Sequence, residues 1–498
     1  MERPNFLFIL TDQQRADTLG AYGCAVGATP NLDRLAAGGV TCARAYCNNP
    51  LCMPSRASLL TGRYPHASGV RTNGCAPRSG QALLPDLLSR AGYRTAAFGK
   101  VHYHPVRAEP EGYWPENQHV IASGEDLTRP YLGFHEIALG CGHGDVMPGL
   151  HTRELQARHP EVLERRGPRG ALRTPDTALK ETRGLNTYQT SVPLEHYPTT
   201  WVTDRTVEYL MRAEEPFFLW CGLNDPHHPF CPPGPYWDRF KPEEMPAPRK
   251  RAGELDAMPP HFKAVYEGRY RDRDTDGFMW GSEPYLSEEN VRLMAAAYYG
   301  MIALIDDSVA RMLDALERRG LRENTVVVFA SDHGELLGDH GLILKGPYQY
   351  ESSLRVPFVW NAPRRLPACG VVRRPVGLVD FMPTILELAG VECPAGVQGR
   401  SLVEALGGLD ASDEGEAYVE NDVDALGLRM RTLVTERWKI TAYANPEHGE
   451  LFDLENDPDE FENLWDRGDP KVKQALLRRL AAAMIRNQDP LPAKTCHA

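Results

Sequence analysis

The sequence predicts an α/β fold, with a large mixed, mostly parallel sheet sandwiched by helices and a smaller C-terminal α+β domain. Several short runs of consecutive apolar residues predict strands that are covered on both faces, as in parallel sheets. Segments with helical spacing lie between these runs, and an alternation of strands and helices is typical of α/β folds. The predicted strands comprise residues 6–10, 95–98, 217–223, 326–330 and 356–360.

The predicted helices are recognised by their apolar stripes and by the glycines that follow them. Residues 83–88 carry four leucines and are followed by Gly92. Residues 199–212 form a second candidate, and residues 291–319 form a long amphipathic helix that stops at Gly320. Glycine is common just past the last turn of a helix because it tolerates the left-handed conformation needed there.

The chain divides into two parts where residues 394–416 become rich in glycine and aspartate. We assign residues 1–400 to the large α/β domain and residues 415–498 to the small α+β domain. Two stretches lack the strand–helix rhythm and are interpreted as insertions, near residues 105–190 and 230–290. Within the small domain the predicted elements are strands near residues 432–443 and 451–454 and a helix near residues 472–485.

The overall composition excludes several classes of protein. With 55 Lys and Arg against 67 Asp and Glu, the net charge is −12, so a nucleic-acid partner is not expected. The 11 cysteines form no CxxC pair, which argues against a zinc ribbon or a thioredoxin-type site. The apolar run at residues 6–10 is too short for a secretory leader, and no run approaches a membrane span. We therefore expect a cytoplasmic protein with no membrane partner.

Polar side chains follow four of the predicted strands, at the point where each strand ends. A single aspartate in this position often caps the next helix. The carboxyl ends of parallel strands meet at one edge of a sheet, however, and ligands bind there. The joint occurrence therefore predicts one polar site, formed by Asp12, Gln13, Lys100, His102, His227, Asp332 and His333.

The residue types at these strand ends predict a metal centre for an anionic ester. Asp12, Asp332 and His333 offer two carboxylates and an imidazole, which favour a hard divalent cation such as calcium, magnesium or manganese. Positive charge beside such a cation suits an ester in which negative charge develops on oxygen. The basic side chains predicted near the cation are Lys100, His102, His227 and Lys345.

Cys52 is the candidate nucleophile, in the segment CMPSR at the start of a predicted helix. A helix N-terminus and the neighbouring Arg56 would depress the pKa of a thiol. Two interpretations remain open from the residues alone. The cysteine could be a buried structural residue or a thiolate nucleophile, although a soft thiolate is a poor match for a hard metal ion.

The segment CMPSRASLLTGRYP resembles the signature of the sulfatases, a family within the alkaline-phosphatase superfamily. The resemblance extends over most of the chain. It implies an alkaline-phosphatase-like fold and an arylsulfatase-like hydrolysis of sulfate monoesters. The other segments that carry it are TDQQRADTLGAYG, GKVH, NDPHHPF, SDHGELLGDHG, KGPYQYE and ELFDLENDPDEFENL.

By this resemblance, a maturation enzyme oxidises Cys52 to formylglycine. The hydrated aldehyde would then be both the nucleophile that attacks sulfur and an oxygen ligand of the metal, which removes the objection to a soft ligand. Arg56 would orient the hydrate and offset its charge. The implied ligands of one divalent ion are Asp12, Gln13, Asp332, His333 and the oxidised Cys52.

The resemblance also implies how the substrate is handled. Lys100 and Lys345 would bind sulfate oxygens, and His227 would protonate the departing alcohol or phenol. His102 would assist the collapse of the hemiacetal sulfate. Asn73, in the segment RTNG, is also expected to contact the substrate, as a feature shared with the related phosphonate monoester hydrolases.

Two positions depart from the common sulfatase pattern. Gln13 stands where many sulfatases have a second acidic residue, and His333 follows Asp332 where others have asparagine. This combination also resembles the phosphonate monoester hydrolases, relatives that cleave phosphonate monoesters and phosphodiesters. The pair Lys100-x-His102 is the sulfatase pattern, so we favour a sulfate ester and expect some cross-activity.

Three further expectations follow from the family resemblance. Calcium is the expected ion, with manganese and magnesium as alternatives. A homo-oligomer, dimer or tetramer, is expected. A protein that binds sulfated ligands without turnover is disfavoured, because the proposed ligands and catalytic residues are all present.

Overall fold

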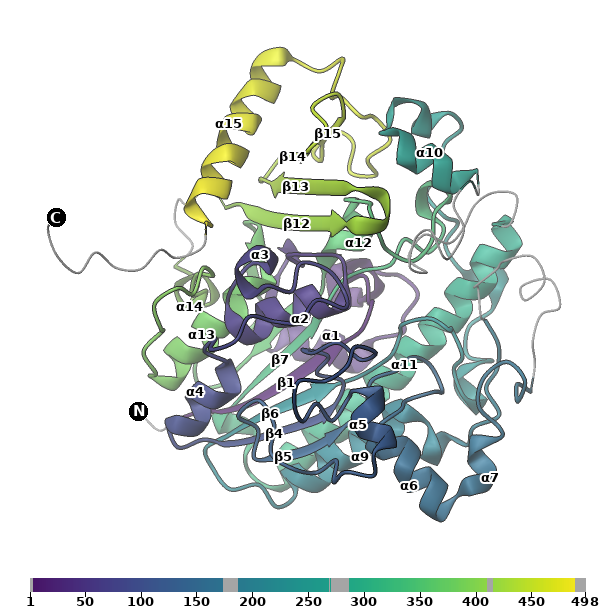
Figure 1. Cartoon of the computed structure of the whole chain (residues 1–498), viewed down its shortest axis with the longest axis vertical. Coiled ribbons are helices and arrows are strands. Elements are labelled where there is room, and N and C mark those ends of the chain that lie inside the picture. Colours follow the sequence, from purple (N-terminus) through teal and green to yellow (C-terminus); the bar gives the residue numbers. More distant parts are fainter. Residues whose placement is uncertain (1–2, 173–186, 268, 270–285, 410–414, 489–498) are drawn as a thin grey trace, which may run out of the picture.

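A mixed eight-stranded sheet forms the centre of the molecule (Figure 1). The computed structural model describes residues 3–172, 187–267, 269, 286–409 and 415–488. The strand order is β10-β2-β9-β7-β1-β6-β4-β5, and every neighbouring pair is parallel except the two that involve β9. The predicted α/β fold with a mostly parallel sheet is confirmed. The strands are β1 (Asn5–Thr11), β2 (Val40–Cys42), β4 (Arg94–Gly99), β5 (Glu136–Leu139), β6 (Phe217–Gly222), β7 (Thr325–Ser331), β9 (Phe358–Asn361) and β10 (Gly370–Val372).

Helices cover both faces of this sheet. Successive side chains of β1 point to opposite faces, so its apolar run places apolar side chains on both of them. Phe6 and Phe8 belong to a buried cluster with side chains of α2, α4 and α13. Leu7 and Ile9 belong to a second cluster with side chains of α1, α9 and α11. The uninterrupted apolar run is therefore explained by a strand that is buried on both faces. These helices are α1 (Pro30–Ala37), α2 (Cys52–Thr61), α4 (Leu84–Arg90), α9 (Pro198–Leu210), α11 (Glu288–Arg318) and α13 (Phe381–Ala389).

The long helix α11 is the single element among the described residues with the length and apolar character to cross a membrane. Most of its apolar stretch is buried inside the protein, against α9 and α1 among others. Its start is capped by Ser287, whose side chain accepts a hydrogen bond from the Asn290 backbone N–H (3.2 Å). The helix predicted at residues 291–319 is thus a core helix of the α/β domain.

The strand predicted at residues 356–360 is two short strands in different sheets. Pro357 separates β8 (Arg355–Val356) from β9, since proline has no backbone N–H to donate to a ladder. β8 pairs with β3 (Ala45–Tyr46) in a three-stranded sheet of order β11-β3-β8, whereas β9 lies antiparallel between β2 and β7. The prediction of one continuous strand at this position is wrong.

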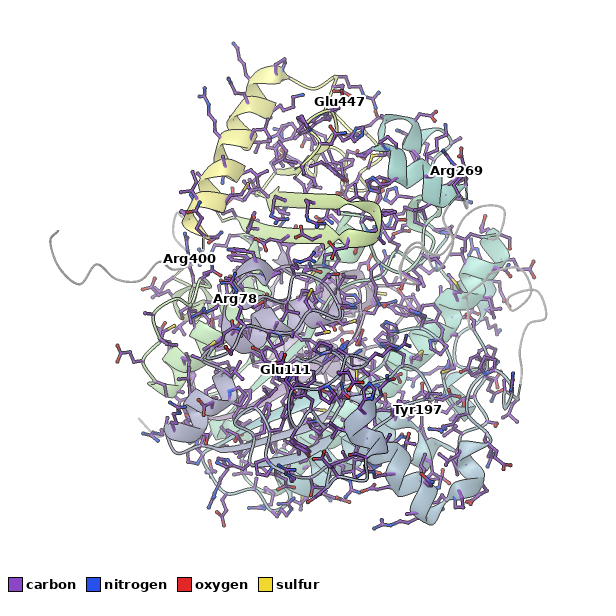
Figure 2. All side chains as sticks on the ribbon, viewed as in Figure 1. Arg78, Glu111, Tyr197, Arg269, Arg400 and Glu447 are labelled. Carbon is purple, nitrogen blue, oxygen red and sulfur yellow. The ribbon has the colours of Figure 1, made fainter. Side chains whose placement is uncertain are left out.

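The C-terminal domain consists of a four-stranded antiparallel sheet with one helix packed on it (Figure 1). The strands are β12 (Ala417–Val423), β13 (Leu428–Val434), β14 (Trp438–Tyr443) and β15 (Gly449–Asp453), and the helix is α15 (Pro470–Arg486). β12 contacts β3 and β11 of the three-stranded sheet. Glu447, in the turn between β14 and β15, lies at the far end of this domain (Figure 2).

Short elements complete the chain around these sheets. The first stretch interpreted as an insertion also supplies β5, the edge strand of the large sheet. Residues 173–186 and 270–285 of the two stretches lie outside the described residues. The remaining short elements are α3 (Pro65–Ser68), α5 (Gln118–Ala122), α6 (Leu150–Arg158), α7 (Pro160–Leu163), α10 (Pro260–Tyr266), α12 (Glu351–Leu354), β11 (Val376–Gly377) and α14 (Val403–Leu406).

The buried Glu450 makes the stability of the C-terminal sheet depend on pH. Burial raises the pKa of this carboxyl from its ordinary 4.5 to about 7, against the hydrogen bond donated by Tyr443. A raised folded-state pKa means that the fold favours the protonated form, so stability falls as pH rises from about 4.5 through 7. We expect Glu450→Gln to remove this loss, which amounts to about 3 kcal/mol at most.

Urea unfolding midpoints at pH 5 and pH 8 measure the effect. The wild type should lose more stability between the two pH values than the variant does. Exposed Glu447, replaced by Gln, is the control and should behave as the wild type. Equal pH dependence in wild type and Glu450→Gln would contradict the prediction.

Candidate active site

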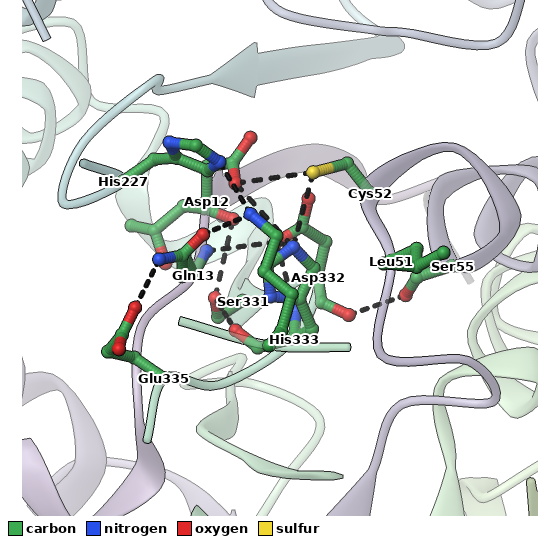
Figure 3. A network of polar contacts seen from close by, with 12 residues as sticks. Asp12, Gln13, Leu51, Cys52, Ser55, His227, Ser331, Asp332, His333 and Glu335 are labelled. Carbon is green, nitrogen blue, oxygen red and sulfur yellow. Dashed lines mark hydrogen bonds and ion pairs between the residues drawn. The ribbon is translucent and has the colours of Figure 1, made fainter. Parts of the chain in front are cut away.

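The loops that follow β1, β4, β6 and β7 bring the predicted residues together at one edge of the large sheet (Figure 3). Thr11 and Ser331 are paired at the ends of β1 and β7, so the next residues, Asp12 and Asp332, emerge side by side. The Asp332 backbone N–H donates to the Thr11 carbonyl (3.2 Å), and that of Asp12 donates to the Asp225 carbonyl (3.1 Å). Strand register thus sets the positions of both carboxylates.

Two glycines allow Lys100 to enter this site. Gly99 and Gly222 are paired at the ends of β4 and β6, and the Lys100 backbone N–H donates to the Gly222 carbonyl (2.8 Å). Gly99 has a φ of +84°, and a Cβ on it would lie 2.0 Å from the Gly222 oxygen. A larger residue at position 99 would therefore push the strands apart and displace the lysine.

Four ligand-type side chains form a compact buried cluster. The ligand atoms of Asp12, Cys52, Asp332 and His333 all lie within 4.8 Å of one another. Cys52 Sγ is 3.2 Å from His333 Nε2 and 3.7 Å from Asp12 Oδ1. Two carboxylates and an imidazole suit a hard divalent cation, and an oxygen at the position of the sulfur would suit it better than a thiol. The residues present therefore fit the predicted metal.

Positive side chains hold the two carboxylates in place. Arg56 donates to Asp332 Oδ2 through Nε (2.7 Å) and to Asp12 Oδ2 through Nη2 (3.3 Å). Lys100 Nζ also donates to Asp12 Oδ2 (2.5 Å). Burial by itself would raise the pKa of Asp12, but Lys100 and Arg56 outweigh it and hold that pKa well below its ordinary value. Asp12 is therefore ionised and ready to bind a cation.

The predicted depression of the Cys52 pKa is wrong. Burial, followed by the charge of Asp12, raises the pKa of this thiol from 9.0 to about 11, although Lys100 and Lys345 act in the opposite direction. The residue begins α2, as predicted, but the side chain points into a buried acidic cluster. A thiolate nucleophile at neutral pH is therefore unsupported, whereas an oxygen nucleophile at this position fits the surroundings.

Lys345 and His227 form the opposite side of the site. Lys345 Nζ lies 2.5 Å from His227 Nε2, and it also donates to the Gln13 side-chain oxygen. Because an ammonium group only donates, His227 Nε2 accepts here, and its Nδ1–H donates to the His228 carbonyl (2.5 Å). Burial, with the neighbouring His143 and Lys345, holds the pKa of His227 well below 6.5.

His143 belongs to the site but was missed in the sequence. Its Nε2 lies 3.1 Å from Lys100 Nζ, and its ring stacks on His227 with centroids 3.6 Å apart and planes 11° apart. His143 lies in the loop after β5, so the rule that located the other residues applies to it too. Asp145 fixes this loop by accepting hydrogen bonds from Tyr188 (3.0 Å) and from other groups of the first insertion.

Contacts join most of the predicted residues in one network, and two of them lie beside it. Asn73 accepts from the Met53 backbone N–H (3.1 Å) at the start of α2. His102 has a positive φ of 50°, and its backbone N–H donates to the buried Glu116 (2.7 Å), which the sequence did not single out. The network comprises Asp12, Gln13, Cys52, Arg56, Lys100, His227, Asp332, His333 and Lys345.

Asp225 is not one of the site residues, but its side chain anchors the loop that carries His227. Tyr197, labelled in Figure 2 before the start of α9, donates to Asp225 Oδ1 (3.2 Å), and Thr199 donates to Oδ2 (2.7 Å). Burial raises the pKa of Asp225 to about 7, partly offset by these donors. The loop that carries His227 is therefore tied to α9.

A comparison with known families agrees with this geometry. The sulfatase family model matches residues 4–391, which is most of the chain. The chain belongs to the sulfatase family. The model of the N-sulphoglucosamine sulphohydrolase C-terminal region matches residues 338–488, which include β12 to β15 and α15.

Individual relatives of this sulfatase cover nearly the whole chain. An arylsulfatase of Clostridium perfringens is 29% identical, over 96% of this chain and 93% of the relative. The multifunctional alkaline phosphatase superfamily protein PehA of Trinickia caryophylli is 31% identical, over 97% and 94%. The crystal structure of the phosphonate monoester hydrolase of Agrobacterium radiobacter superposes with a TM-score of 0.81 at 27% identity, over 99% and 97%. Both branches that the sequence resembles are therefore found among its relatives.

Proposed function

We propose that this sulfatase hydrolyses a sulfate monoester to an alcohol or phenol and free sulfate, in the manner of an arylsulfatase. The observation that carries the proposal is the buried cluster of Asp12, Cys52, Asp332 and His333, with Lys100 beside it. Carboxylates for a cation and an ammonium group for sulfate oxygens are the groups that such a reaction requires.

A divalent cation and the formylglycine formed from Cys52 would complete the chemistry of this cluster. Asp12, Gln13, Asp332 and His333 would hold the divalent cation, which supplies positive charge for sulfate oxygens. As the hydrate of formylglycine, Cys52 would supply an oxygen nucleophile and a second hydroxyl that later releases sulfate. Calcium is the ion we propose, since the donors are mainly oxygens.

The remaining side chains orient the substrate and move protons. Lys100 and Lys345 would turn from Asp12 and Gln13 toward sulfate oxygens. The negative charge of a bound sulfate ester beside His227 would favour its protonated form, with the added proton taken up from solvent at Nε2. His227 would then donate this proton to the leaving oxygen, after Lys345 has turned to the sulfate. His102, whose buried Nδ1 has no hydrogen-bond partner among the described residues, would accept a proton when sulfate is released.

Replacing His227 by Asn should slow poor leaving groups more than good ones. Without a proton donor, an alcohol must leave as its unstable alkoxide anion, whereas 4-nitrophenolate is stable as an anion. We expect kcat to fall about 10²–10⁴-fold for an alkyl sulfate and much less for 4-nitrophenyl sulfate. A plot of log kcat against leaving-group pKa measures the effect, and an unchanged slope would contradict this role.

The second candidate function is hydrolysis of a phosphonate monoester or phosphodiester. It is favoured by the similarity to the phosphonate monoester hydrolase structure and by the Gln13 and His333 pair. Values of kcat/KM for an aryl sulfate and for the matching aryl phosphonate monoester decide between the two. A higher value for the sulfate supports our proposal, and a large preference for the phosphonate overturns it.

Three more proposals concern the protein in its cell. We propose modification of Cys52 by a formylglycine-generating enzyme, assembly into a homo-oligomer (dimer or tetramer) and location in the cytoplasm. Peptide mass spectrometry, light scattering and cell fractionation test them in turn. An unmodified Cys52 from a host with the maturation enzyme would overturn the first.

A further inference from the structure

Glu335 is a buried carboxylate that the mechanism above does not use. It lies two residues after His333, in the segment SDHGE, and has no exposed surface. One carboxylate oxygen, Oε1, accepts hydrogen bonds from the backbone N–H groups of Leu337 (2.9 Å) and Leu344. The other, Oε2, accepts from the side-chain nitrogen of Gln13 (Figure 3).

Hydrogen bonds fix the backbone N–H and the backbone carbonyl of Gln13, which leaves the orientation of its side-chain amide to be explained. Its N–H donates to Asp332 Oδ1 (3.0 Å), and its carbonyl accepts from the Tyr298 hydroxyl (2.7 Å). Its φ of +67° is in the left-handed region, which is costly for glutamine and persists where the surroundings enforce it. The amide then lies between Glu335 and Lys345.

The chemistry of these two neighbours dictates which way round the amide sits. An ionised carboxylate only accepts hydrogen bonds, and an ammonium group only donates them. The amide NH₂ must therefore face Glu335, and the amide oxygen must face Lys345. The contact with Lys345 is sufficient for this assignment: Lys345 Nζ can only donate, so the Gln13 atom that faces it is the oxygen, and the NH₂ is left for Glu335.

We propose that Glu335 is a positioning residue that sets the orientation of the Gln13 amide and thereby turns its oxygen toward the site. Many sulfatases have a second acidic residue at the position of Gln13, so that a carboxylate faces the site. Here the carboxylate of Glu335 lies on the far side of the Gln13 amide, and the neutral amide oxygen faces Lys345. The inference depends on the proposed function only for the choice of substrates.

A charge swap tests this arrangement. Gln13→Glu alone places two carboxylates face to face. Glu335→Gln alone places two NH₂ groups face to face. To avoid this contact, the amide of Gln13 must turn, which directs its nitrogen toward Lys345. In the double variant, the amide oxygen of the new glutamine still accepts from Leu337 and Leu344, while its NH₂ donates to the new glutamate. The net charge of the pair is then that of the wild type.

We expect each single variant to lower kcat/KM for an aryl sulfate at least about tenfold, and the double variant to return within about threefold of the wild type. Such non-additivity is the mark of two groups in direct contact. Urea midpoints of the metal-free proteins should follow the same order. Glu450→Gln, which neutralises a buried carboxylate in the C-terminal sheet, is the control and should keep wild-type kcat/KM.

Two results would overturn the inference. One is wild-type kcat/KM in Glu335→Gln, and the other is a double variant whose losses are the sum of the two single losses. If Gln13→Glu does not fold, comparison of Glu335→Gln with the double variant still decides. If the wild type turns over no sulfate ester, the proposed function fails, and the urea midpoints still test the charge swap.

Discussion

Cys52→Ala should lower kcat/KM for an aryl sulfate by about 10⁴-fold or more, because it removes the nucleophile of a covalent mechanism. Cys52 is 3% exposed and lies within hydrogen-bond range of His333 and Asp12, so alanine leaves space at the centre of the cluster. The carboxylates, the lysines and the arginine are unchanged in this variant. The loss should therefore appear in kcat, with little change in the binding of inorganic sulfate.

Two controls separate the nucleophile from its surroundings. Cys47→Ala removes another buried thiol, whose Sγ contacts the Ser353 carbonyl and which is not one of the four clustered ligand residues, and should keep most of the activity. Sulfate affinity, measured as product inhibition in the wild type and by calorimetry in Cys52→Ala, should agree within about threefold. Substantial turnover by Cys52→Ala would show that residue 52 is not the nucleophile.

The predictable part of the site follows from the burial of the strands. In β1 and β7 every residue is buried, and the sequence is apolar between the polar first and last residues of each strand. The first charged residue after each apolar run marks the end of the strand, which is why Asp12, Lys100 and Asp332 could be assigned to one edge from the sequence. The parallel direction of these strands then places them together.

The other part depends on distances that a sequence does not contain. His143 follows β5, a four-residue strand inside a stretch without regular pattern, and its stacking on His227 joins loops far apart in the chain. The direction of β9 depends on its pairing with β2 and β7, not on its own composition. The pKa of Cys52 was mispredicted because its position at the start of a helix is visible in a sequence, whereas its burial beside Asp12 is not.

Arg56→Met should destabilise the metal-free protein by about 3–5 kcal/mol, the range seen when one partner of a buried ion pair is removed. The Arg56 side chain has no exposed surface, nor have its partners Asp12 and Asp332. Methionine fills much of the space but leaves Asp332 without its cationic partner. Lys100 still pairs with Asp12, so the loss comes mainly from Asp332.

A bound cation should offset part of this loss, because it replaces the positive charge that the variant lacks. We therefore expect the urea midpoint of Arg56→Met to rise more on addition of calcium than that of the wild type. Arg71→Met is the matched control: its guanidinium pairs with Asp424 at the surface, where such pairs contribute only about 0–1 kcal/mol. Equal midpoints for Arg56→Met and Arg71→Met without metal would show that Arg56 does not neutralise the cluster. Equal calcium shifts in variant and wild type would place the cation away from Asp12 and Asp332.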